Sequence, residues 1–407
     1  MGTYWRLFSV VLLFGISLPP HSSSQQRATP PPVQFAPPIM YGYPASYPQA
    51  IASGDFNNDG IPDLIVGSEY GDGLIKLGRG DGTFGPWRWG ARSNNISVIA
   101  VGKFNGENRK LDAVLNDYSD AWVEGNGHRA FLDAGGNSVA GFAVGDFNGH
   151  GKLDVAALVE SEPTAAYLYL GNGDGTFQPA RVFSLEERVP TAILTGDFNG
   201  DGKPDLAVLC SEQVAVLLGD GKGGFGSPIR FRFSNKYPYL PYAMTSADFN
   251  GNHKLDLAVA YQNSKGGSSF IRILMGNGDG TFRRGALARA GKFEPSIATA
   301  DFNGDGIPDL VVPGDHCLID GHHANCISVL LGNGNGTFQP PANFRGAAAQ
   351  ITVADFNGDG KPDVAGVFPS GVSVLINTTP FPALNAKPAA NPITLALPYR
   401  RPESGEK

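Results

Sequence analysis

The chain has 407 residues and a formal charge of −7 at pH 7, with 42% hydrophobic and 17% charged residues. Its 55 glycines fall at regular positions instead of in low-complexity runs, which argues against an intrinsically disordered chain. No basic stripe runs through the sequence, so we expect no nucleic-acid partner.

The N-terminus has the features of a secretory signal peptide over residues 1–24. Arg6 gives a positive start, Leu7–Leu18 forms an apolar core, and Ser22 and Ser24 suit the −3 and −1 positions of cleavage. An uncleaved N-terminal anchor is the alternative, although twelve apolar residues are short for a bilayer span. We therefore expect a secreted protein, extracellular or periplasmic, with no membrane span after cleavage.

A nine-residue pattern, Asp-Phe-Asn-Gly-Asp-Gly-x-Pro-Asp, recurs along the rest of the chain. Its seven full or altered copies begin at residues 55, 103, 146, 197, 248, 301 and 355, so they stand about 50 residues apart. Such periodicity indicates a repeat architecture over residues 33–379. The flanking segments, a linker at 25–32 and a Pro-rich tail at 380–407, are expected to be disordered.

The copy that begins at Asp197 shows how one repeat folds. Apolar runs at 191–196, 206–210 and 214–218 and an alternating run at 225–233 are separated by turns rich in Gly and polar residues. This arrangement predicts a four-stranded antiparallel sheet. Seven such sheets predict an all-β, seven-bladed propeller, which closes radially and leaves few exposed edges.

The turn between the third and fourth strands has its own motif, Gly-Asn-Gly-Asp-Gly-Thr-Phe, as in Gly171–Phe177. Its Phe is expected to pack between blades. The seventh copy ends near Asn377 without a fourth strand. Because Phe35–Tyr41 resembles the fourth-strand segment Phe338–Phe344, residues 33–43 are predicted to supply the missing outer strand.

The Asp loop and the Gly-Asn-Gly-Asp-Gly-Thr-Phe turn together resemble the FG-GAP (VCBS-type) repeat family. This propeller occurs in the integrin alpha-subunit head and in some fungal lectins. The resemblance covers residues 34–377, nearly the whole mature chain. It implies a seven-bladed propeller with calcium in the loop joining strands 1 and 2. The partner stays open, since the fold hosts adhesion, sugar binding and appendages to enzymes.

The repeated loop also has the chemistry of a hard-cation site. Oxygen side chains at positions 1, 3, 5 and 9, a Gly at position 6 and an inward carbonyl at position 7 favour Ca²⁺ over Mg²⁺. Four loops carry three carboxylates each, and their predicted ligands are Asp55, Asn57, Asp59, Ile61 and Asp63; Asp197, Asn199, Asp201, Lys203 and Asp205; Asp301, Asn303, Asp305, Ile307 and Asp309; and Asp355, Asn357, Asp359, Lys361 and Asp363. The alternative is an Asx-rich turn whose side chains only satisfy local backbone amides.

Three loops depart from this pattern. The fifth, with two carboxylates, should bind calcium more weakly; the third has a His, a poor calcium ligand; and in the second a Lys ammonium is expected to replace the metal. Their residues are Asp248, Asn250, Asn252 and Asp256; Asp146, Asn148, His150 and Asp154; and Lys103, Glu107 and Asp112. We therefore expect about four strong calcium sites and one or two weaker ones, all structural.

Aromatic residues gather in the connections at the face opposite the Asp loops. They either contact sugars or a protein partner or pack between blades, with packing favoured for Trp87 and Trp89. The set comprises Tyr41, Tyr43, Tyr47, Trp87, Trp89, Tyr118, Trp122, Tyr237, Tyr239, Tyr242 and Tyr261.

The sixth repeat carries an insertion at residues 315–326. Cys317 and Cys326 bracket it, so a disulfide-closed surface loop is expected, with a transition-metal site as the alternative. The histidines of that alternative site are His316, His322 and His323. Cys210 ends an apolar strand and is predicted to be a buried small hydrophobe.

These observations predict a calcium-binding propeller that acts as a protein–protein or adhesion module. Its expected partner is an unidentified extracellular protein or glycan. A carbohydrate-binding lectin is the alternative, and a polysaccharide-degrading enzyme on this scaffold is the third reading. The chain shows neither His-Glu-x-x-His nor Gly-x-Ser-x-Gly, and no open metal position with a nearby base, so we expect no enzyme.

Overall fold

The computed structural model describes residues 32–381, apart from short internal gaps. These gaps are 46, 70, 92–94, 107–109, 117–119, 126–127, 186–189, 211–212, 234–238, 264–268, 290–295 and 347–348. The predicted signal peptide at 1–24, almost all of the linker at 25–32 and all but two residues of the tail at 380–407 lie outside the described residues.

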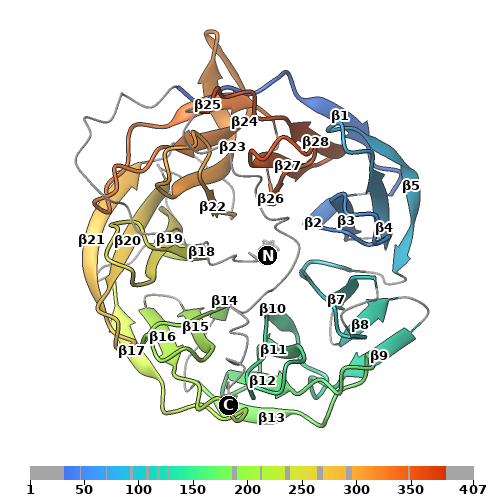
Figure 1. Ribbon diagram of the computed structural model, residues 1–407, viewed down its shortest axis with the longest axis vertical. Helices are drawn as coiled ribbons and strands as arrows, with labels where there is room; N and C mark the ends of the chain where they lie inside the picture. The colour runs from blue at the N-terminus through green and yellow to red at the C-terminus, as the bar shows by residue number, and fades with distance from the viewer. Residues whose placement is uncertain are drawn as a thin grey trace, which may run out of the picture.

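The described strands form seven four-stranded antiparallel sheets, arranged as the blades of a ring (Figure 1). From the inside outward, blade one is β2 (Pro48–Gly54), β3 (Asp63–Ser68), β4 (Gly71–Gly78) and β5 (Phe84–Ala91); blade two is β6 (Ile99–Gly102), β7 (Asp112–Asn116), β8 (Ala121–Gly125) and β9 (His128–Leu132); blade three is β10 (Val139–Gly145), β11 (Asp154–Val159), β12 (Ala165–Tyr169) and β13 (Arg181–Ser184); blade four is β14 (Pro190–Gly196), β15 (Asp205–Cys210), β16 (Gln213–Leu217) and β17 (Ile229–Arg232); blade five is β18 (Tyr239–Ala247), β19 (Asp256–Asn263), β20 (Ser269–Gly276) and β21 (Phe282–Arg289); blade six is β22 (Ala298–Ala300), β23 (Asp309–Ile319), β24 (His322–Leu330) and β25 (Ala342–Arg345); and blade seven is β26 (Ile351–Ala354), β27 (Asp363–Phe368), β28 (Gly371–Leu375) and β1 (Ile39–Gly42). The predicted all-β, seven-bladed propeller is confirmed.

The core of the molecule lies between the blades. Each of its seven apolar clusters joins side chains of two neighbouring blades, as Leu168 and Val208 do between blades three and four. Middle strands such as β15 are therefore buried on both faces, which explains why they read as continuous apolar runs. Each inner strand contacts the inner strands of both neighbours, β2 with β26 included, so the ring is closed.

Blade seven takes its outer strand from the N-terminal segment. Strand β1 runs antiparallel to β28, with Ile39 opposite Val374 and Tyr41 opposite Val372. An isolated bridge joins Phe35 to Asn377 just beyond this pairing. The segment predicted from its likeness to other fourth strands thus pairs where expected.

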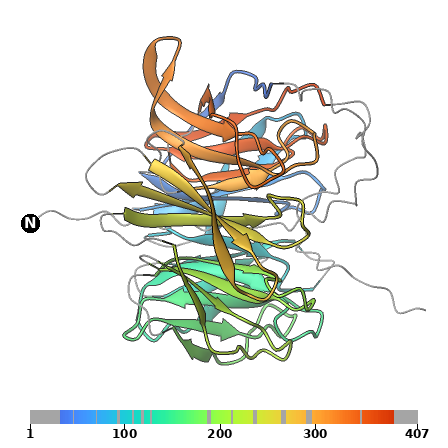
Figure 2. The same ribbon diagram turned by 90° about the vertical axis from the view of Figure 1, so that its left-hand side faces the viewer.

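Blade six carries a longer hairpin than its neighbours. Strands β23 and β24 extend beyond the rest of the ring (Figure 2), and a disulfide joins Cys317 to Cys326 with their Cα atoms 6.0 Å apart. The hairpin tip exposes His322 and His323 to solvent. Cys210 is buried and is not part of the disulfide, as predicted. Within the described residues no helix has the length and apolar character needed to cross a membrane.

Candidate metal loops and the contacts between blades

The Asp loops connect strands 1 and 2 of each blade and fold back on themselves through left-handed residues. In blade four, Gly200 at position 4 has φ +75° and Gly202 at position 6 has φ +81°. Asn58 takes position 4 in blade one with φ +64°, and His253 takes position 6 in blade five with φ +63°. The sequence indicated the sharp turn only at position 6. Glycine suits both positions because it adopts positive φ without steric cost.

Side chains at positions 1 and 3 bind the amides of their own loop. In blade four, Asp197 Oδ1 accepts from the backbone N–H groups of Gly200 (2.7 Å) and Asp201 (3.1 Å), and its Oδ2 accepts from Gly202 N–H (2.8 Å). Asn199 Oδ1 accepts from Asp201 N–H at 2.9 Å. The hydrogen bonds of the Asx-turn alternative are therefore present. They leave lone pairs on the carboxylate oxygens, so they are compatible with a bound cation.

The carboxylate at position 9 ties the Asp loop to the turn between strands 3 and 4. Asp205 is fully buried, and its two oxygens accept from Phe198 N–H and Gly219 N–H, each at 2.8 Å. The same pair of bonds recurs at Asp63, Asp154, Asp256 and Asp309, and at Asp363 the backbone N–H of Asn377 takes the place of the turn Gly. This residue type was expected to close a metal shell; the structure adds a clamp between two loops.

Burial makes these carboxylates costly to ionise. The pKa of Asp205 is raised to about 6, chiefly by desolvation; the two backbone hydrogen bonds lower it, and the nearby carboxylates of Asp197 and Asp201 add to the rise. The pKa of Asp363 is raised to about 7 and that of Asp309 well above its usual range, both chiefly by desolvation. A cation in the loop would oppose these shifts, because it favours the charged form.

Position 5 differs among the four full loops. In blades four and seven, Asp201 and Asp359 pair with Lys203 and Lys361 of the same loop at 3.0 and 3.1 Å. In blades one and six, the position-3 amide donates to this carboxylate, as Asn57 Nδ2 does to Asp59 Oδ2 at 2.8 Å. A cation that used the position-5 carboxylate would displace these donors.

Blade three brings its candidate ligands closest together. Among the described residues, the one group of three His, Cys, Asp or Glu side chains whose ligand atoms all lie within 4.8 Å of one another is Asp146, His150 and Asp154. This is the loop in which the sequence indicated only weak calcium binding.

The loops of blades two and five satisfy their buried carboxylate by an internal amide. Asn105 Nδ2 donates to both oxygens of Asp112 at 2.8 and 2.9 Å, and Asn250 Nδ2 donates to Asp256 at 2.8 Å. Glu107, the predicted partner of the Lys103 ammonium, lies outside the described residues.

Five of the Asp loops are also held by a turn of the next blade. Gly223, in the turn of blade four, donates its N–H to the carbonyl of Phe147 in the loop of blade three at 3.0 Å. The ring of Phe225 packs edge-on against Phe147 with centroids 5.6 Å apart. Equivalent pairs, each a Gly N–H on a Phe carbonyl, are Gly82 and Phe356, Gly175 and Phe104, Gly280 and Phe198, and Gly336 and Phe249. The predicted packing of the turn Phe between blades is confirmed.

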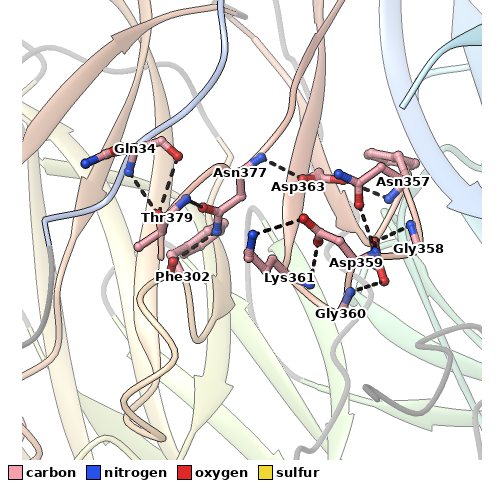
Figure 3. Close-up of polar contacts among 12 residues, drawn as sticks. Gln34, Phe302, Asn357, Gly358, Asp359, Gly360, Lys361, Asp363, Asn377 and Thr379 are labelled. Carbon is pink, nitrogen blue, oxygen red and sulfur yellow. Dashed lines mark hydrogen bonds and ion pairs between the residues drawn. The ribbon is translucent and has the colours of Figure 1, made fainter. Parts of the chain in front are cut away.

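Between blades six and seven, where this turn is missing, the two end segments of the described ring (residues 34–35 and 377–379) make the same contacts (Figure 3). Asn377 Nδ2 donates to Phe302 O at 2.9 Å, and the ring of Phe35 lies 6.1 Å from that of Phe302. Thr379 N–H donates to Asn377 Oδ1 at 2.9 Å, and Gln34 N–H donates to Thr379 Oγ1 at 2.9 Å. Side chains here replace the backbone of a turn.

The aromatic residues assigned to the opposite face divide into packed and exposed side chains. Tyr43, Trp122 and Tyr261 are buried, and Trp87 packs edge-on against Tyr43 with centroids 4.9 Å apart. The packing expected for Trp89 is wrong, since 64% of this residue is exposed. Of the other members, Tyr47 is 56% exposed, Tyr41 and Tyr242 are half-buried, and Tyr118, Tyr237 and the side chain of Tyr239 lie outside the described residues.

The histidines of the blade-six insertion are not brought together into a described site. His322 and His323 are exposed and pair across the hairpin with Ile319 and Leu318. The side chain of His316 lies outside the described residues.

Three solved structures of low sequence identity are similar to this chain, and the two with a TM-score above 0.5 share its fold. A lectin from Agrocybe aegerita, solved for its specific recognition of non-reducing terminal N-acetylglucosamine, is 18% identical, with 72% of this chain and 79% of that chain covered and a TM-score of 0.49. BBS1N in complex with ARL6DN is 10% identical; its lead-soaked crystal gives a TM-score of 0.59 over 87% of this chain and 98% of that one, and its mercury-soaked crystal gives 0.57 over 88% and 99%.

A family match covers most of the ring. Residues 55–115, 146–208, 197–259, 248–312 and 317–366 match the FG-GAP-like repeat. The matched stretches include all seven Asp loops, and together they span more than half of the chain. The chain therefore belongs to the FG-GAP-like repeat family.

Proposed function

We propose that this chain is a secreted, calcium-binding propeller that acts as a non-catalytic binding module. The observation that carries the calcium assignment is the position-9 carboxylate, which is fully buried beside two further carboxylates of its loop in blades one, four, six and seven. Clustered carboxylates with hard oxygen donors and no sulfur fit Ca²⁺. Blade five, with Asp248 and Asp256, supplies a weaker site.

Calcium here would neutralise the loop and hold its oxygens together, a structural role. Residues of the loop contact the next blade, so an ordered loop also orders that contact. In blade four, Phe198 follows the first ligand, Asp197, and its carbonyl accepts the N–H of Gly280 from blade five at 3.0 Å. A loop held in one shape therefore presents a fixed acceptor and a fixed ring to its neighbour.

The calcium proposal is tested by Asp197→Ala. This variant should melt at a lower temperature than the wild type in calcium, and the difference should shrink in a strong chelator, because only the calcium-bound state depends on the ligand. Asp220→Ala is the matched control, since Asp220 belongs to the exposed 3–4 turn of the same blade and accepts hydrogen bonds from the backbone N–H groups of Lys222 and Gly224. Equal losses for Asp197→Ala in both conditions would contradict metal ligation.

The binding role is assigned to the face opposite the Asp loops, with an extracellular protein as the partner. Tyr47 precedes β2 and Trp89 lies near the end of β5, so both belong to the side of blade one where the 4–1 connections run. They are 56% and 64% exposed, and exposed aromatic side chains are frequent anchors of protein interfaces. The Cys317–Cys326 disulfide on the same side suits an oxidising compartment.

A glycan array and a panel of immobilised extracellular proteins, both in calcium, test this assignment. Saturable protein binding that is lost in Trp89→Ser and kept in Val182→Ser supports it; Val182 is a suitable control because it is 57% exposed on the outer strand of blade three. Saturable sugar binding with the same dependence on Trp89 would favour the lectin alternative. Turnover of a polysaccharide would replace both with an enzyme.

A further inference from the structure

The blade-three loop combines an imidazole with two carboxylates, whereas the full loops offer only oxygen. Asp146 follows β10, Asp154 begins β11, and His150 stands between them at position 5. His150 Nδ1 lies 3.1 Å from Asp146 Oδ1, and the ligand atoms of all three residues lie within 4.8 Å of one another. Asp146 is 7% exposed and Asp154 is fully buried, so the carboxylates face a poorly solvated site.

The imidazole is oriented by a backbone carbonyl. His150 Nε2 lies 2.9 Å from Gly171 O, and because a carbonyl only accepts, Nε2 carries the hydrogen. A neutral ring then points the lone pair of Nδ1 at Asp146 Oδ1, an unfavourable pairing unless a cation lies between them. A metal-binding histidine typically has its other nitrogen held in this way. A proton on Nδ1 is the competing cation.

The lysine of this loop does not supply the missing positive charge inside it. In blade four, Lys203 pairs with the position-5 carboxylate of its own loop at 3.0 Å. The equivalent Lys152 of blade three instead donates from Nζ to the carbonyl of Asn172, in the turn between strands 3 and 4. The space among Asp146, His150 and Asp154 thus remains a cluster of acceptors.

One nitrogen and two carboxylate oxygens select a different ion from the other loops. Calcium takes six to eight oxygen ligands, whereas zinc binds imidazole and carboxylate in fours at about 2.0–2.2 Å. His150, with 30% of its side chain exposed, leaves a route for the ion and a water ligand. We propose that the blade-three loop binds Zn²⁺ through Asp146, His150 and Asp154 instead of Ca²⁺. This inference rests on the local donor set and does not require calcium in any other loop.

Calorimetric titration of the full chain, stripped of metals and then held in excess calcium, tests the proposal. The wild type should take up one equivalent of Zn²⁺, and Co²⁺ in its place should give the visible absorption of a four-coordinate site. His150→Asp restores the position-5 residue of the full loops. It should weaken zinc binding by at least about 100-fold, as the loss of a ligand implies, and should add one equivalent of bound calcium.

Two further variants keep the outcome interpretable. His150→Asn places the blade-five residue at this position and should also lose zinc, which covers the case in which His150→Asp fails to fold. The double variant His322→Asn and His323→Asn removes exposed imidazoles of the hairpin and should keep the zinc equivalent. The proposal is overturned if the wild type takes up no zinc, which would leave the ring as an ion-paired cation, or if the His150 variants keep it. Calcium uptake by the full loops, read in the same titrations, reports separately on the proposed function.

Discussion

The junction between blades six and seven and the junction between blades three and four make the same contacts from different parts of the chain. At the latter, Gly223 N–H and the ring of Phe225 reach Phe147 of the preceding blade. At the former, the side chain of Asn377 and the ring of Phe35 reach Phe302. Each junction of the propeller therefore requires an N–H donor to the carbonyl of the loop Phe and an aromatic side chain packed against that Phe. Different segments of the chain can supply these two groups.

The two junctions differ in how far they enclose the loop beneath them. Beside blade six, a Cβ on Gly304 would lie 2.5 Å from the ring of Phe381, so the C-terminal segment packs directly on the loop. Asn303 is fully buried there, and desolvation raises the pKa of Asp309 well above its usual range. In blade three the neighbouring turn leaves His150 partly exposed. The blade-six loop, covered by the end segments of the ring, is thus less exposed to solvent than the blade-three loop, covered by a turn.

The largest expected effect comes from Asn377→Leu. The substitution keeps the size of a fully buried side chain but leaves Phe302 O and Thr379 N–H without their partner, so it should cost about 2–4 kcal/mol of unfolding free energy. Chemical denaturation measures this. Asn333→Leu, in the exposed turn of blade six, should cost less than about 1 kcal/mol. Equal losses would mean that the amide of Asn377 does not substitute for a turn.

Truncating one aromatic side chain at the junction of blades six and seven and one at the junction of blades five and six compares closure by the N-terminal segment with closure by a turn. Phe35→Ala removes contacts with Phe302 and Phe344, and Phe338→Ala removes the contact with Phe249. Both rings are only partly buried, so each change should cost about 2–3 kcal/mol, below the values for a fully buried Phe. Denaturation of both variants should give losses within about 1 kcal/mol of each other. A far smaller loss of stability for Phe35→Ala would show that the aromatic contact of the N-terminal segment contributes little to the stability of the propeller.

The pH dependence of stability separates the carboxylates of the two junctions. The folded-state pKa values of Asp363, about 7, and Asp205, about 6, lie above the ordinary aspartate value of 3.8. Their protonated forms therefore suit the fold, and the stability this gives is present at low pH and lost as pH rises through these values. In chelator, unfolding free energy should fall from pH 4 to pH 8, and calcium should flatten the fall.

Asparagine variants identify the groups responsible. Asp363→Asn should remove the part of the fall near pH 7. Asp205→Asn should remove one share of the part near pH 6, because the pKa values of Asp63, Asp154, Asp256 and Asp301 are also raised to about 6. Denaturation curves at several pH values provide the measurement. Unchanged slopes in both variants would assign the pH dependence to other groups.

The smallest expected effect lies at the edge of the closing junction. Thr379→Val removes the hydroxyl that accepts from Gln34 N–H at 2.9 Å in a partly buried position, at a cost of about 1 kcal/mol. Thr378→Val changes an exposed neighbour and should stay within about 0.5 kcal/mol of the wild type. If the two variants have the same stability, the backbone alone holds the chain ends together.

Much of this fold could be predicted from the sequence because each repeat contains the patterns of its own strands and turns. The Asp loops fixed the register of strands 1 and 2, and the likeness of Phe35–Tyr41 to other fourth strands predicted the pairing with β28. The role of Asn377 was hidden, since an Asn at a strand end gives no local signal. Its place in the repeat, where other blades have a Gly after the third strand, is the clue that was available.

The candidate sites were harder to predict because their properties depend on contacts made across the fold. A position-9 Asp reads as a ligand, yet its two backbone donors depend on how the 3–4 turn returns to the loop, as Gly219 does to Asp205. Trp87 and Trp89 are alike in sequence, but Trp87 meets Tyr43, a residue 44 positions earlier, while Trp89 faces solvent. Side-chain exposure is set by the neighbouring segment, which no local pattern contains.

The hydrogen bond from Thr378 N–H to Gln34 O places the two ends of the described ring side by side. A short artificial linker between residues 32 and 381 would therefore join them without disturbing a blade. New termini could then be opened in the connection between β17 and β18, where no described strand would be cut. Such a circularly permuted chain keeps every strand pairing, so the ring itself, more than the order in which it is synthesised, defines this protein's architecture.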